Sequence, residues 1–415
     1  MIESTTRTTK GIYSKYNDLT LLREIIGWAI SNNYSFALWK LPQSNSRHLI
    51  IDTSSERTTC LEPEIESLSP CFIFSPYDND DNKKWMFIPA RIHLLISNNV
   101  DSEKISYTFD KSISDHNQLH EIESFVEKSE DLPQELNFYT QPAEFSDEAC
   151  QKSHFINMIE GAISEIEKGI FEKVVPSRIK KIDLAESINL LDSFWNMTCS
   201  YLNSFISLVS SPSTGTWIGA TPEILISVED RMFHTTALAA TQRHTGQEDL
   251  RKVSWTQKEI EEQAMVSRYI INCFKRIRLR EFEEHGPKTI KAGNLLHLKT
   301  DYSVDMIARD FPLLGTVMLK LLHPTSAICG MPKNEAMEFL KKNELFNRQF
   351  FGGFLGPVNI DDQTSLFVNL RCGQVQEDSI LLYTGAGVTI DSDPEKEWEE
   401  TEVKCETLER FLSPS

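Results

Sequence analysis

The sequence predicts a large α/β or α+β sandwich, in which strands are covered by helices. The first observation behind this prediction is a series of long strand-like runs after residue 147, separated by short polar connections. The second is that amphipathic helix patterns lie between these runs. Strands and helices in such an order are typical of layered folds, where helices bury one face of a sheet.

The composition is that of a globular protein with an acidic excess. The 415 residues include 61 Asp and Glu against 42 Lys and Arg, which gives a net charge of −19. Proteins that bind nucleic acid concentrate basic residues, so this balance argues against nucleic-acid binding as the main activity. No stretch approaches the roughly 18 apolar residues of a membrane span, and the polar start lacks the apolar core of a secretory signal. We therefore expect a cytoplasmic protein that binds neither nucleic acid nor membrane.

The eight cysteines form neither a metal-binding pattern nor a disulfide pattern. They are scattered, with no Cys-x-x-Cys pair and no zinc-finger spacing to histidine. Several lie in apolar runs, where a thiol packs as a small hydrophobic group. We expect all of them to be reduced: Cys60, Cys71, Cys150, Cys199, Cys273, Cys329, Cys372 and Cys405.

Residues 1–145 form an N-terminal portion without a motif that points to chemistry. Short apolar runs at residues 35–39 and 70–74 predict strands, and the Asn- and Asp-rich residues 79–84 predict a loop. Residues 117–147 are acidic and polar, which predicts a solvated connection. Because the chain changes character there, residues 146–415 are expected to carry the chemistry.

From residue 147 onward the expected elements follow one another closely. Apolar residues recur with helical spacing over residues 155–170, and Gly169 ends that helix. Residues 171–179 alternate like a strand, and Pro176 places it at an edge or a bulge. The other predicted strands cover residues 205–210, 217–228, 232–240, 365–371 and 380–388, and the other predicted helices cover residues 256–277, 304–321, 334–343 and 394–412.

Two of these helices carry pairs of glutamates three residues apart. Glu259 and Glu262 lie on the helix over residues 256–277, and Glu397 and Glu400 lie on the last helix. Residues at this spacing share a helix face, so four carboxylates would converge if the helices met. An oxygen-only site of this kind suits Mg²⁺. Glutamate pairs are also common on solvated helix faces, and the spacing alone leaves both interpretations open.

Two charged residues lie within apolar strand patterns. Lys173 shares a strand face with Phe171 and Val175, where loss of solvation would suit it to act as a general base. The alternative is an edge lysine that reaches water. Glu223 follows Pro222 in an apolar strand, where a raised pKa would let the carboxyl group donate a proton. Its alternative is a charge at a bulge that faces water.

Further candidates for ligand contact lie near strand ends. Arg371 ends an apolar strand, and a guanidinium binds a carboxylate through two parallel hydrogen bonds. Gly385 and Gly387 lie on one strand face, where a ligand could approach the backbone closely. His323, before Pro324, is either a structural hydrogen-bonding residue or part of a site. The glycine-rich stretches lack the features of nucleotide-binding loops.

Taken in order, these segments resemble the chorismate-utilising enzymes, the family that includes anthranilate, aminodeoxychorismate, salicylate and isochorismate synthases. The resemblance covers roughly residues 148–412. It implies two sheets layered between helices, with the first third of the chain completing the fold. It is carried by Phe171-x-Lys-Val-Val-x-Ser-Arg178, Gly219-Ala-Thr-Pro-Glu223, Ala237-Leu-Ala-Ala-Thr241, His323-Pro-Thr-x-Ala-x-Cys-Gly330, and Gly385-Ala-Gly387 followed by Glu397-Trp-x-Glu-Thr401.

The resemblance also implies roles in binding and converting chorismate. Lys173 matches the family's general base and Glu223 its general acid. The four glutamates 259, 262, 397 and 400 match a Mg²⁺ site that holds the ring carboxylate of the substrate. We expect a monomer or a weak homodimer. The residues that match substrate-binding positions are Thr241, His323, Arg371, Gly385, Ala386, Gly387 and Lys404.

Within the family the sequence is most like isochorismate synthase, an isomerase of menaquinone or siderophore biosynthesis. Ala239 stands where one type of aminodeoxychorismate synthase has a nucleophilic lysine, and the segment after His323 resembles isochorismate synthases more than anthranilate synthases. Salicylate synthase, an anthranilate synthase component and a non-catalytic scaffold that binds chorismate or a partner stay open. Two residues depart from the family pattern. Ala240 replaces a glycine and could crowd the ring, and Gln263 replaces a histidine beside a metal ligand.

Overall fold

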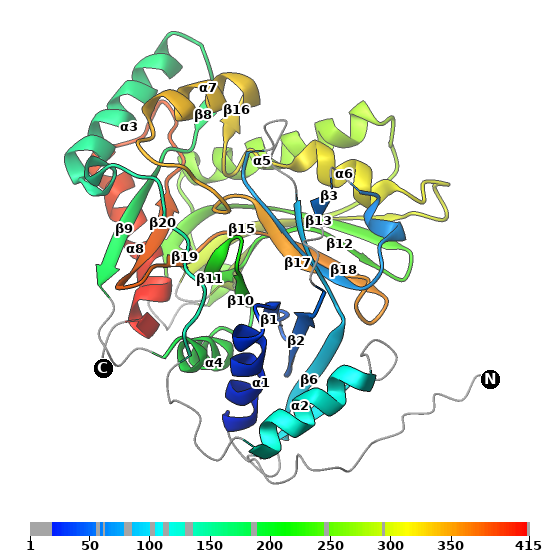
Figure 1. The fold of residues 1–415 in the computed structure, drawn as a ribbon. Helices are drawn as coiled ribbons and strands as arrows, with labels where there is room; N and C mark the ends of the chain where they lie inside the picture. The colour runs from blue at the N-terminus through cyan, green and yellow to red at the C-terminus, as the bar shows by residue number, and fades with distance from the viewer. Residues whose placement is uncertain are drawn as a thin grey trace.

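In the computed structural model, two large antiparallel sheets are stacked between layers of helices (Figure 1). The structure describes residues 19–54, 59–60, 63–78, 85–99, 104–110, 116–128, 136–183, 189–244, 249–292 and 295–412. Within these residues each large sheet has nine strands. The predicted sandwich of sheets and helices is therefore confirmed.

Both sheets combine strands from the two ends of the chain. In spatial order the first sheet contains β7 (Lys104–Phe109), β6 (Ile92–Asn99), β2 (Ser46–Asp52), β1 (Ser35–Lys40), β10 (Phe205–Ser211), β11 (Gly215–Thr221), β19 (Cys372–Val375), β20 (Ser379–Gly385) and β9 (Ser177–Asp183). The second contains β14 (Glu283–Ala292), β15 (Leu295–Asp305), β13 (Met232–Arg243), β12 (Ile224–Glu229), β18 (Gln363–Val368), β17 (Phe354–Val358), β4 (Cys71–Ser75), β5 (Trp85–Pro89) and β3 (Thr59–Cys60). A separate two-stranded ladder pairs β8 (Lys173–Val174) with β16 (Gly330–Met331).

An aromatic layer fills the space between the two large sheets. Trp217 of the first sheet contacts Phe74 of the second edge-on, with ring centroids 6.1 Å apart. Phe205 of the first sheet stacks on Phe367 of the second, with centroids 4.2 Å apart. All four side chains are almost completely buried. Aromatic pairs of this kind add to the hydrophobic stabilisation that buries one face of each sheet.

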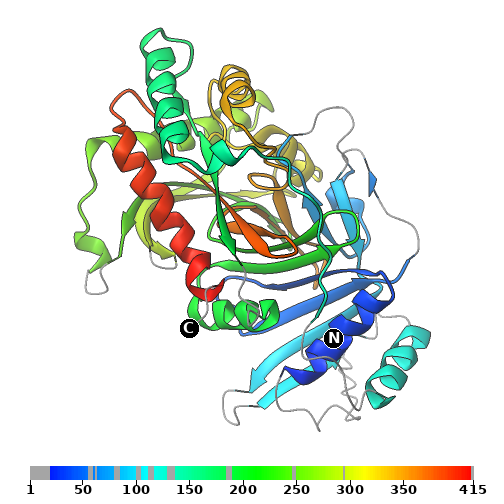
Figure 2. The same ribbon diagram turned by 60° about the vertical axis from the view of Figure 1, so that its left-hand side comes forward.

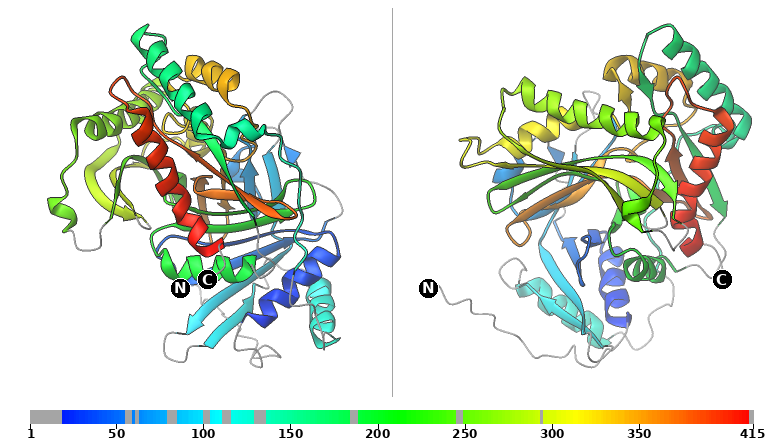
Figure 3. Two further views of the ribbon diagram at one scale, coloured as in Figure 1. Left: turned by 90° about the vertical axis from the view of Figure 1, so that its left-hand side faces the viewer. Right: turned by 180° about the vertical axis from the view of Figure 1, so that it is seen from behind.

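Helices cover the outer face of each sheet (Figures 2 and 3). Those on the first sheet are α1 (Thr20–Ser31), α2 (His116–Lys128), α4 (Leu190–Ser200) and α8 (Pro394–Leu412). Those on the second sheet are α5 (Gln257–Arg276) and α6 (Leu314–Leu322). The helices α3 (Lys152–Glu167) and α7 (Lys333–Asn343) pack with β8 at one end of the molecule. Short 3₁₀ turns lie at η2 (Ile65–Ser67), η3 (Asp147–Cys150) and η4 (Leu250–Lys252).

Two helix predictions need correction. The helix expected over residues 304–321 begins only at Leu314, because Val304 still pairs with Phe233 at the end of β15. The solvated connection expected over residues 117–147 contains most of α2. Leu119 and Ile122 of that helix pack into the core under the first sheet, which explains why a polar segment is helical. The helices predicted over residues 155–170, 256–277, 334–343 and 394–412 are confirmed to within a few residues.

Four strand predictions were too long, and one of them is the strand over residues 380–388, which ends at Gly385. The strand over residues 171–179 is interrupted at Val175 and Pro176, since proline lacks the N–H that a ladder requires. The strands over residues 217–228 and 365–371 are interrupted because the chain passes there from one large sheet to the other. The loop predicted at residues 79–84 lies outside the described residues.

Two further expectations concern the cysteines and membranes. Seven of the eight cysteines, all except Cys60, are found as free thiols. Most of them are buried, and burial raises the pKa of Cys71 to about 12. In the described part of the chain, no helix is both long enough and apolar enough to cross a membrane.

Candidate active site

A cavity opens where the chain crosses twice between the two large sheets. The first crossing, from β11 to β12, contains Glu223, and the second, from β18 to β19, contains Arg371. The Val368 N–H donates to the Glu223 carbonyl at 2.9 Å, and the Ala220 N–H donates to the Arg371 carbonyl at 2.9 Å. These bonds hold the two crossings together, so both charged side chains come from one short region of backbone.

The cavity encloses about 80 Å³, within about 720 Å³ of empty space that is partly open to solvent. Eight of the predicted site residues line it: Glu223, Thr241, Glu262, Arg371, Gly385, Gly387, Glu400 and Lys404. Others on its wall are Val175, Ser177, Ala239, Ala240, His297, Ile328, Phe351 and Tyr383. The sequence therefore identified much of the polar wall.

The Glu223 carboxyl group is buried and readily protonated. Burial raises its pKa to about 7, against the lowering effect of the positive charges on Arg371, Lys173 and Lys404. The pKa shift that the sequence predicted is therefore confirmed, although the residue lies in a crossing and not inside a strand. A carboxyl group with this pKa is partly protonated near neutral pH and can donate a proton.

Arg371 and Lys404 supply positive charge to the same cavity. Arg371 has a φ of +47°, which fits a tight crossing and not the strand end that the sequence predicted. Burial lowers its pKa, although Glu400 and Glu223 oppose this effect. Lys404 Nζ donates to the Gly385 carbonyl at 2.8 Å and pairs with Glu400 at 2.6 Å. A cavity with two cationic groups favours an anionic ligand.

Gly385, which ends β20, and Gly387, which follows it, are required by protein neighbours. A Cβ on Gly385 would lie 2.6 Å from Ser177 Oγ, and a Cβ on Gly387 would lie 2.7 Å from Glu262 Oε1 and 3.1 Å from Lys173 Cε. We predicted that these glycines permit close approach by a ligand. The structure shows that they permit close approach by residues of the site itself.

Lys173 is not among the residues that line the cavity, but it pairs with Glu262, which does line it. The Lys173 side chain is 1% exposed, and its Nζ lies 2.6 Å from Glu262 Oε1. Burial opposes ionisation of Glu262, but the ammonium groups of Lys173, Lys404 and Lys258 outweigh this effect and lower the pKa of Glu262. The expected edge lysine that reaches water is therefore excluded for Lys173.

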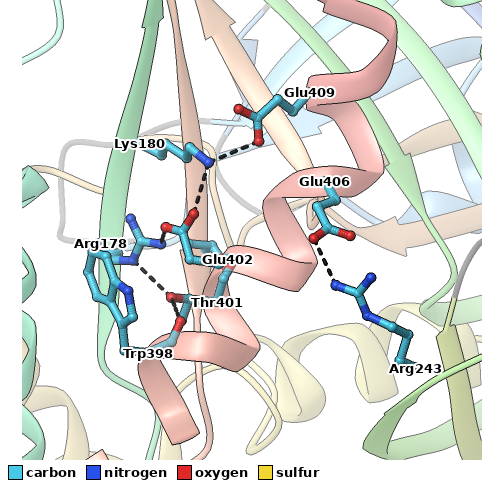
Figure 4. Close-up of polar contacts among 9 residues, drawn as sticks. Arg178, Lys180, Arg243, Trp398, Thr401, Glu402, Glu406 and Glu409 are labelled. Atoms are coloured by element: carbon cyan, nitrogen blue, oxygen red, sulfur yellow. Dashed lines mark hydrogen bonds and ion pairs between the residues drawn. The ribbon is translucent and has the colours of Figure 1, made fainter. Parts of the chain in front are cut away.

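Helix α8 is fixed to β9 by a group of charged side chains (Figure 4). Arg178 Nε donates to Thr401 Oγ1 at 2.9 Å, and its guanidinium also pairs with Glu402. The same guanidinium lies 3.7 Å from the ring centroid of Trp398, a cation–π contact. Lys180 also pairs with Glu402, at 2.9 Å. These contacts fix the rotation of α8 about its axis, which directs its site residues toward α5.

Three of the four predicted metal ligands gather around one lysine. Lys258 pairs with Glu397, whose side chain is 1% exposed. Burial opposes the charge on Lys258, yet Glu397, Glu400 and Glu262 outweigh it and raise the pKa of Lys258. Burial and the neighbouring Glu400 raise the pKa of Glu397, against the effect of Lys258. Several carboxylates therefore share one small region and need a cation there.

Glu259 does not join this group. Its carboxylate accepts from the Thr256 N–H at 2.7 Å and forms the capping box that begins α5. It also accepts from Gln242 Nε2 at 3.0 Å. These contacts engage the carboxylate in capping the helix, whereas the other three glutamates lie near Lys258.

The donor set fits Mg²⁺ in chemistry. Within the described residues, no three His, Cys, Asp or Glu side chains already lie close enough to hold an ion. The buried, mutually repelling carboxylates of Glu397 and Glu400, together with Glu262, nevertheless form the oxygen-only set that Mg²⁺ prefers. Glu262, Glu397 and Glu400 thus fit the ion, and Glu259 does not.

His297 is a cavity residue that the sequence interpretation missed. It lies on β15, is 4% exposed, and its Nδ1 is 2.8 Å from the carbonyl oxygen of Ala240. Burial lowers its pKa to about 3, so the ring is neutral near pH 7 and Nδ1–H donates this bond. Its buried Nε2 has no hydrogen-bond partner among the described residues and is left as an acceptor. A single histidine in an apolar strand gave no motif that could have revealed it.

Ala240 lies in a β-bulge beside this histidine. Between Ala239 and Gln242 the pairing of β13 with β15 shifts register, and Ala240 has a φ of +63°. Only glycine adopts this conformation without strain, which costs alanine roughly 1–2 kcal/mol. The bulge therefore gives a physical reason why a glycine was expected at this position.

Three other residues from the sequence analysis lie away from the cavity wall. His323 packs edge-on against Phe354, with ring centroids 4.9 Å apart, and burial lowers its pKa to about 3. Ala386 is fully buried in the core beneath α3. Gln263 Nε2 donates to the Ala237 carbonyl at 3.2 Å and to Thr300 Oγ1 at 3.0 Å, so it anchors α5 to the second sheet.

The cavity thus combines a readily protonated carboxyl group with two cationic side chains. The family described as chorismate binding enzyme matches residues 55–413. The chain belongs to this family, as the sequence motifs indicated.

Curated relatives in this family carry isochorismate synthase names. The chain is 24% identical over 265 residues to isochorismate synthase MenF of Escherichia coli K12, a match that covers 63% of this chain and 60% of that protein. It is 29% identical over 268 residues to isochorismate synthase DhbC of Bacillus subtilis 168, covering 62% and 67%. The match thus spans about three fifths of the length of the first relative.

Solved structures show the same fold over nearly the whole chain. The menaquinone-specific isochorismate synthase MenF of Escherichia coli superposes with a TM-score of 0.73 at 20% identity, covering 96% of this chain and 92% of that one. Anthranilate synthase component I of Streptococcus pneumoniae superposes with a TM-score of 0.65 at 18% identity, covering 90% and 89%. The fold is thus shared by proteins with different names.

Proposed function

We propose that this protein is a Mg²⁺-dependent isochorismate synthase that isomerises chorismate to isochorismate. The observation that carries the proposal is the buried Glu223 carboxyl group, with a pKa of about 7, in one cavity with Arg371 and Lys404. An acid at this pKa beside cationic groups is what a reaction on a dianion with a poor leaving group requires. The isochorismate synthase relatives support the same choice.

Arg371 and Lys404 are the groups proposed to hold the carboxylates of chorismate. Both line the cavity, and the guanidinium can form two parallel hydrogen bonds with a carboxylate. Thr241 and the backbone at Gly385 line the same wall and can contribute polar contacts. Because the whole chain carries a net charge of −19, it repels a dianion at long range, and local cations must overcome this effect.

Two proton transfers complete the proposed reaction. Lys173 is the residue proposed to take a proton from the water that adds to one ring carbon. Glu223, in its protonated form, gives a proton to the hydroxyl that leaves two carbons away, while the ring double bonds shift. One water is added and one is lost, so the product is an isomer, and the two side chains then exchange protons with solvent.

Mg²⁺ would be held by Glu262, Glu397 and Glu400. When bound, it neutralises and orients the ring carboxylate of the substrate. The three glutamates supply only oxygen donors, and the anionic substrate can supply another, as is common for Mg²⁺ sites. Chorismate binding is therefore expected to be weak without Mg²⁺ and to tighten as the ion is added.

Product analysis tests this proposal most directly. The folded protein is incubated with chorismate and Mg²⁺, and the products are separated by chromatography. Isochorismate is the expected product, and Glu223→Gln should abolish it, whereas Glu229→Gln, a change at an exposed carboxyl group on β12, should not. Salicylate would assign the protein to the salicylate synthases, and a requirement for ammonia would assign it to the anthranilate synthases.

A non-catalytic scaffold is tested by calorimetry on the same protein. Mg²⁺-dependent binding of chorismate without any product would refute the proposed activity and favour the scaffold. Isochorismate feeds both menaquinone and siderophore synthesis, and genes encoded nearby would separate these pathways. Proteins of both pathways are expected to act in the cytoplasm.

A further inference from the structure

A buried ion pair outside the cavity contacts three points of the cavity wall. Glu344 follows the last residue of α7, Arg348 lies four residues later, and their side chains are 6% and 3% exposed. Arg348 Nη2 donates to the Val175 carbonyl at 2.7 Å, and its Nη1 donates to the Ile328 carbonyl at 3.0 Å. Glu344 Oε1 accepts from the Ser177 N–H at 2.9 Å. All three contacted residues line the cavity, although neither partner of the ion pair does.

These contacts replace backbone pairing at a point where that pairing is lost. The ladder between β8 and β16 ends with the bond from the Val175 N–H to the Cys329 carbonyl, at 3.0 Å. Pro176 follows, and it has no N–H with which to continue a ladder. Without the ion pair, the carbonyls of Val175 and Ile328 and the N–H of Ser177 would lose their main partners, which is costly for buried groups. The ion pair supplies these partners through charged hydrogen bonds, which are stronger than neutral ones.

The segment that the ion pair holds lies next to the proposed base. Lys173 is two residues before Val175, on β8. The ladder of β8 with β16 contains only two residue pairs, Lys173 with Met331 and Val174 with Gly330. A pairing this short is weakly fixed by itself, so contacts at its end help to set its position. A displacement of a reacting group by about 1 Å can lower the rate of an enzyme about 100-fold.

We propose that Arg348 and Glu344 form a clamp that positions the backbone of residues 175–177 and, through it, the Lys173 side chain for proton transfer. A guanidinium suits this task because its planar fork donates in several fixed directions at once, here to two carbonyls and a carboxylate. Arg348 and Glu344 are thus positioning residues that touch no substrate. This role rests on the proposed function, in which Lys173 is the base.

The first test measures the kinetics of Arg348→Lys with chorismate. Lysine keeps the positive charge beside Glu344 but lacks the planar fork, so it cannot hold both carbonyls and the carboxylate. We expect kcat to fall at least about tenfold and the KM for chorismate to change less than about threefold, because an interaction that acts on the chemical step lowers kcat. Arg371 and Lys404, which are proposed to hold the substrate, come from other elements.

Arg47→Lys is the matched control for this substitution. Arg47 lies on β2, is 4% exposed and does not line the cavity. Its guanidinium donates to Thr198 Oγ1 at 2.9 Å and to the Asn45 carbonyl at 3.2 Å, so it also joins distant segments. Arg47→Lys should leave kcat unchanged even if it lowers the melting temperature. If the two variants lower kcat by the same factor, the positioning role is refuted.

Glu344→Gln covers the case in which Arg348→Lys does not fold. The carboxylate uses both oxygens, since Oε1 accepts from the Ser177 N–H and Oε2 accepts from Arg348 Nε. An amide has only one oxygen, so one of these two bonds must be lost. We expect the same pattern as for Arg348→Lys, a lowered kcat with little change in KM. A normal kcat in Glu344→Gln would contradict the clamp.

Backbone hydrogen exchange tests the clamp without any reaction. Deuterium uptake by residues 173–178 is followed by mass spectrometry in the unchanged protein and in the folded variants, without chorismate. Uptake should be several-fold faster in Arg348→Lys or Glu344→Gln than in the unchanged protein or Arg47→Lys, because the Ser177 N–H loses a fixed partner. Equal uptake in all of them would overturn the proposal.

The clamp and the proposed function fail in different ways. If the unchanged protein forms no isochorismate, the proposed function is refuted, and hydrogen exchange still decides whether the ion pair holds residues 175–177. If isochorismate forms and the variants keep a normal kcat, the clamp alone is refuted.

Discussion

Replacing Glu223 by glutamine should change stability in a way that depends strongly on pH. Burial raises the pKa of this carboxyl group from 4.5 to about 7, so the folded protein holds a proton that the unfolded chain releases above about pH 4.5. Burial of Glu223 therefore does not lower the free energy of unfolding at low pH. The loss of stability begins as pH rises above 4.5 and reaches its full value above about pH 7. A shift of this size corresponds to roughly 3 kcal/mol.

Glutamine cannot ionise, so Glu223→Gln removes this cost. Linkage gives a relative stabilisation of about 3 kcal/mol at pH 8 but under about 1 kcal/mol at pH 5. Urea unfolding curves of both proteins at the two pH values measure it. Any packing change on substitution contributes equally at both pH values, so the informative quantity is the difference of roughly 2–3 kcal/mol between them. Turnover of chorismate should be lost at the same time.

The exposed Glu229, on β12, provides the control for this experiment. Glu229→Gln should shift the unfolding curve by a similar small amount at both pH values, because this side chain is exposed. If Glu223→Gln shows no larger pH-dependent gain than this control, Glu223 is not the buried acid of the site. The proposed proton donor would then be wrong, whatever the activity data show.

Three further predictions concern other residues of the cavity and core. Lys173→Ala should lower turnover at least about 100-fold while far-UV circular dichroism is unchanged, and near-normal turnover would exclude it as the base. Burial lowers the pKa of His48, His297 and His323 to about 3 each. The free energy of unfolding should therefore be highest above about pH 6.5 and fall as pH decreases, by up to about 2 kcal/mol per histidine at pH 5. Replacing His48 by glutamine should reduce this acid sensitivity in unfolding curves, and an unchanged pH dependence would contradict the prediction. Ala240→Gly should alter the free energy of unfolding by less than about 1 kcal/mol, because relief of strain in the folded protein offsets the added freedom of the unfolded chain. The same change should lower the KM for chorismate. A raised KM would show that the methyl group does not crowd the ligand.

The sequence predicted a site residue well where the evidence for that residue lay in its immediate neighbours along the chain. Glu223 could be recognised because a carboxyl group amid apolar residues is unusual, and its raised pKa followed from burial alone. The glutamate spacing predicted that each pair shares a helix face, because helical periodicity depends only on neighbours along the chain. It did not reveal that the Glu259 carboxylate caps the start of α5.

His297 and Lys258 are residues whose contacts could not be predicted from the spacing of residues along the chain. Each gains its significance from a partner far along the chain, Ala240 for the histidine and Glu397 for the lysine. Long-range pairings are set by how the two sheets and their helices pack, and a single sequence carries no direct record of them.

The sequence by itself determined the sandwich of strands and helices, the acidic character, the family resemblance and the residues of the main motifs, because propensity, periodicity and short motifs are local properties. The tertiary structure decided that the chain crosses between sheets at Glu223 and Arg371, and that α5 and α8 face each other across Lys258. It also decided that Gly387, just after β20, makes room for Lys173 and Glu262. Burial and charge at the site depend on which distant segments meet, and packing alone decides this.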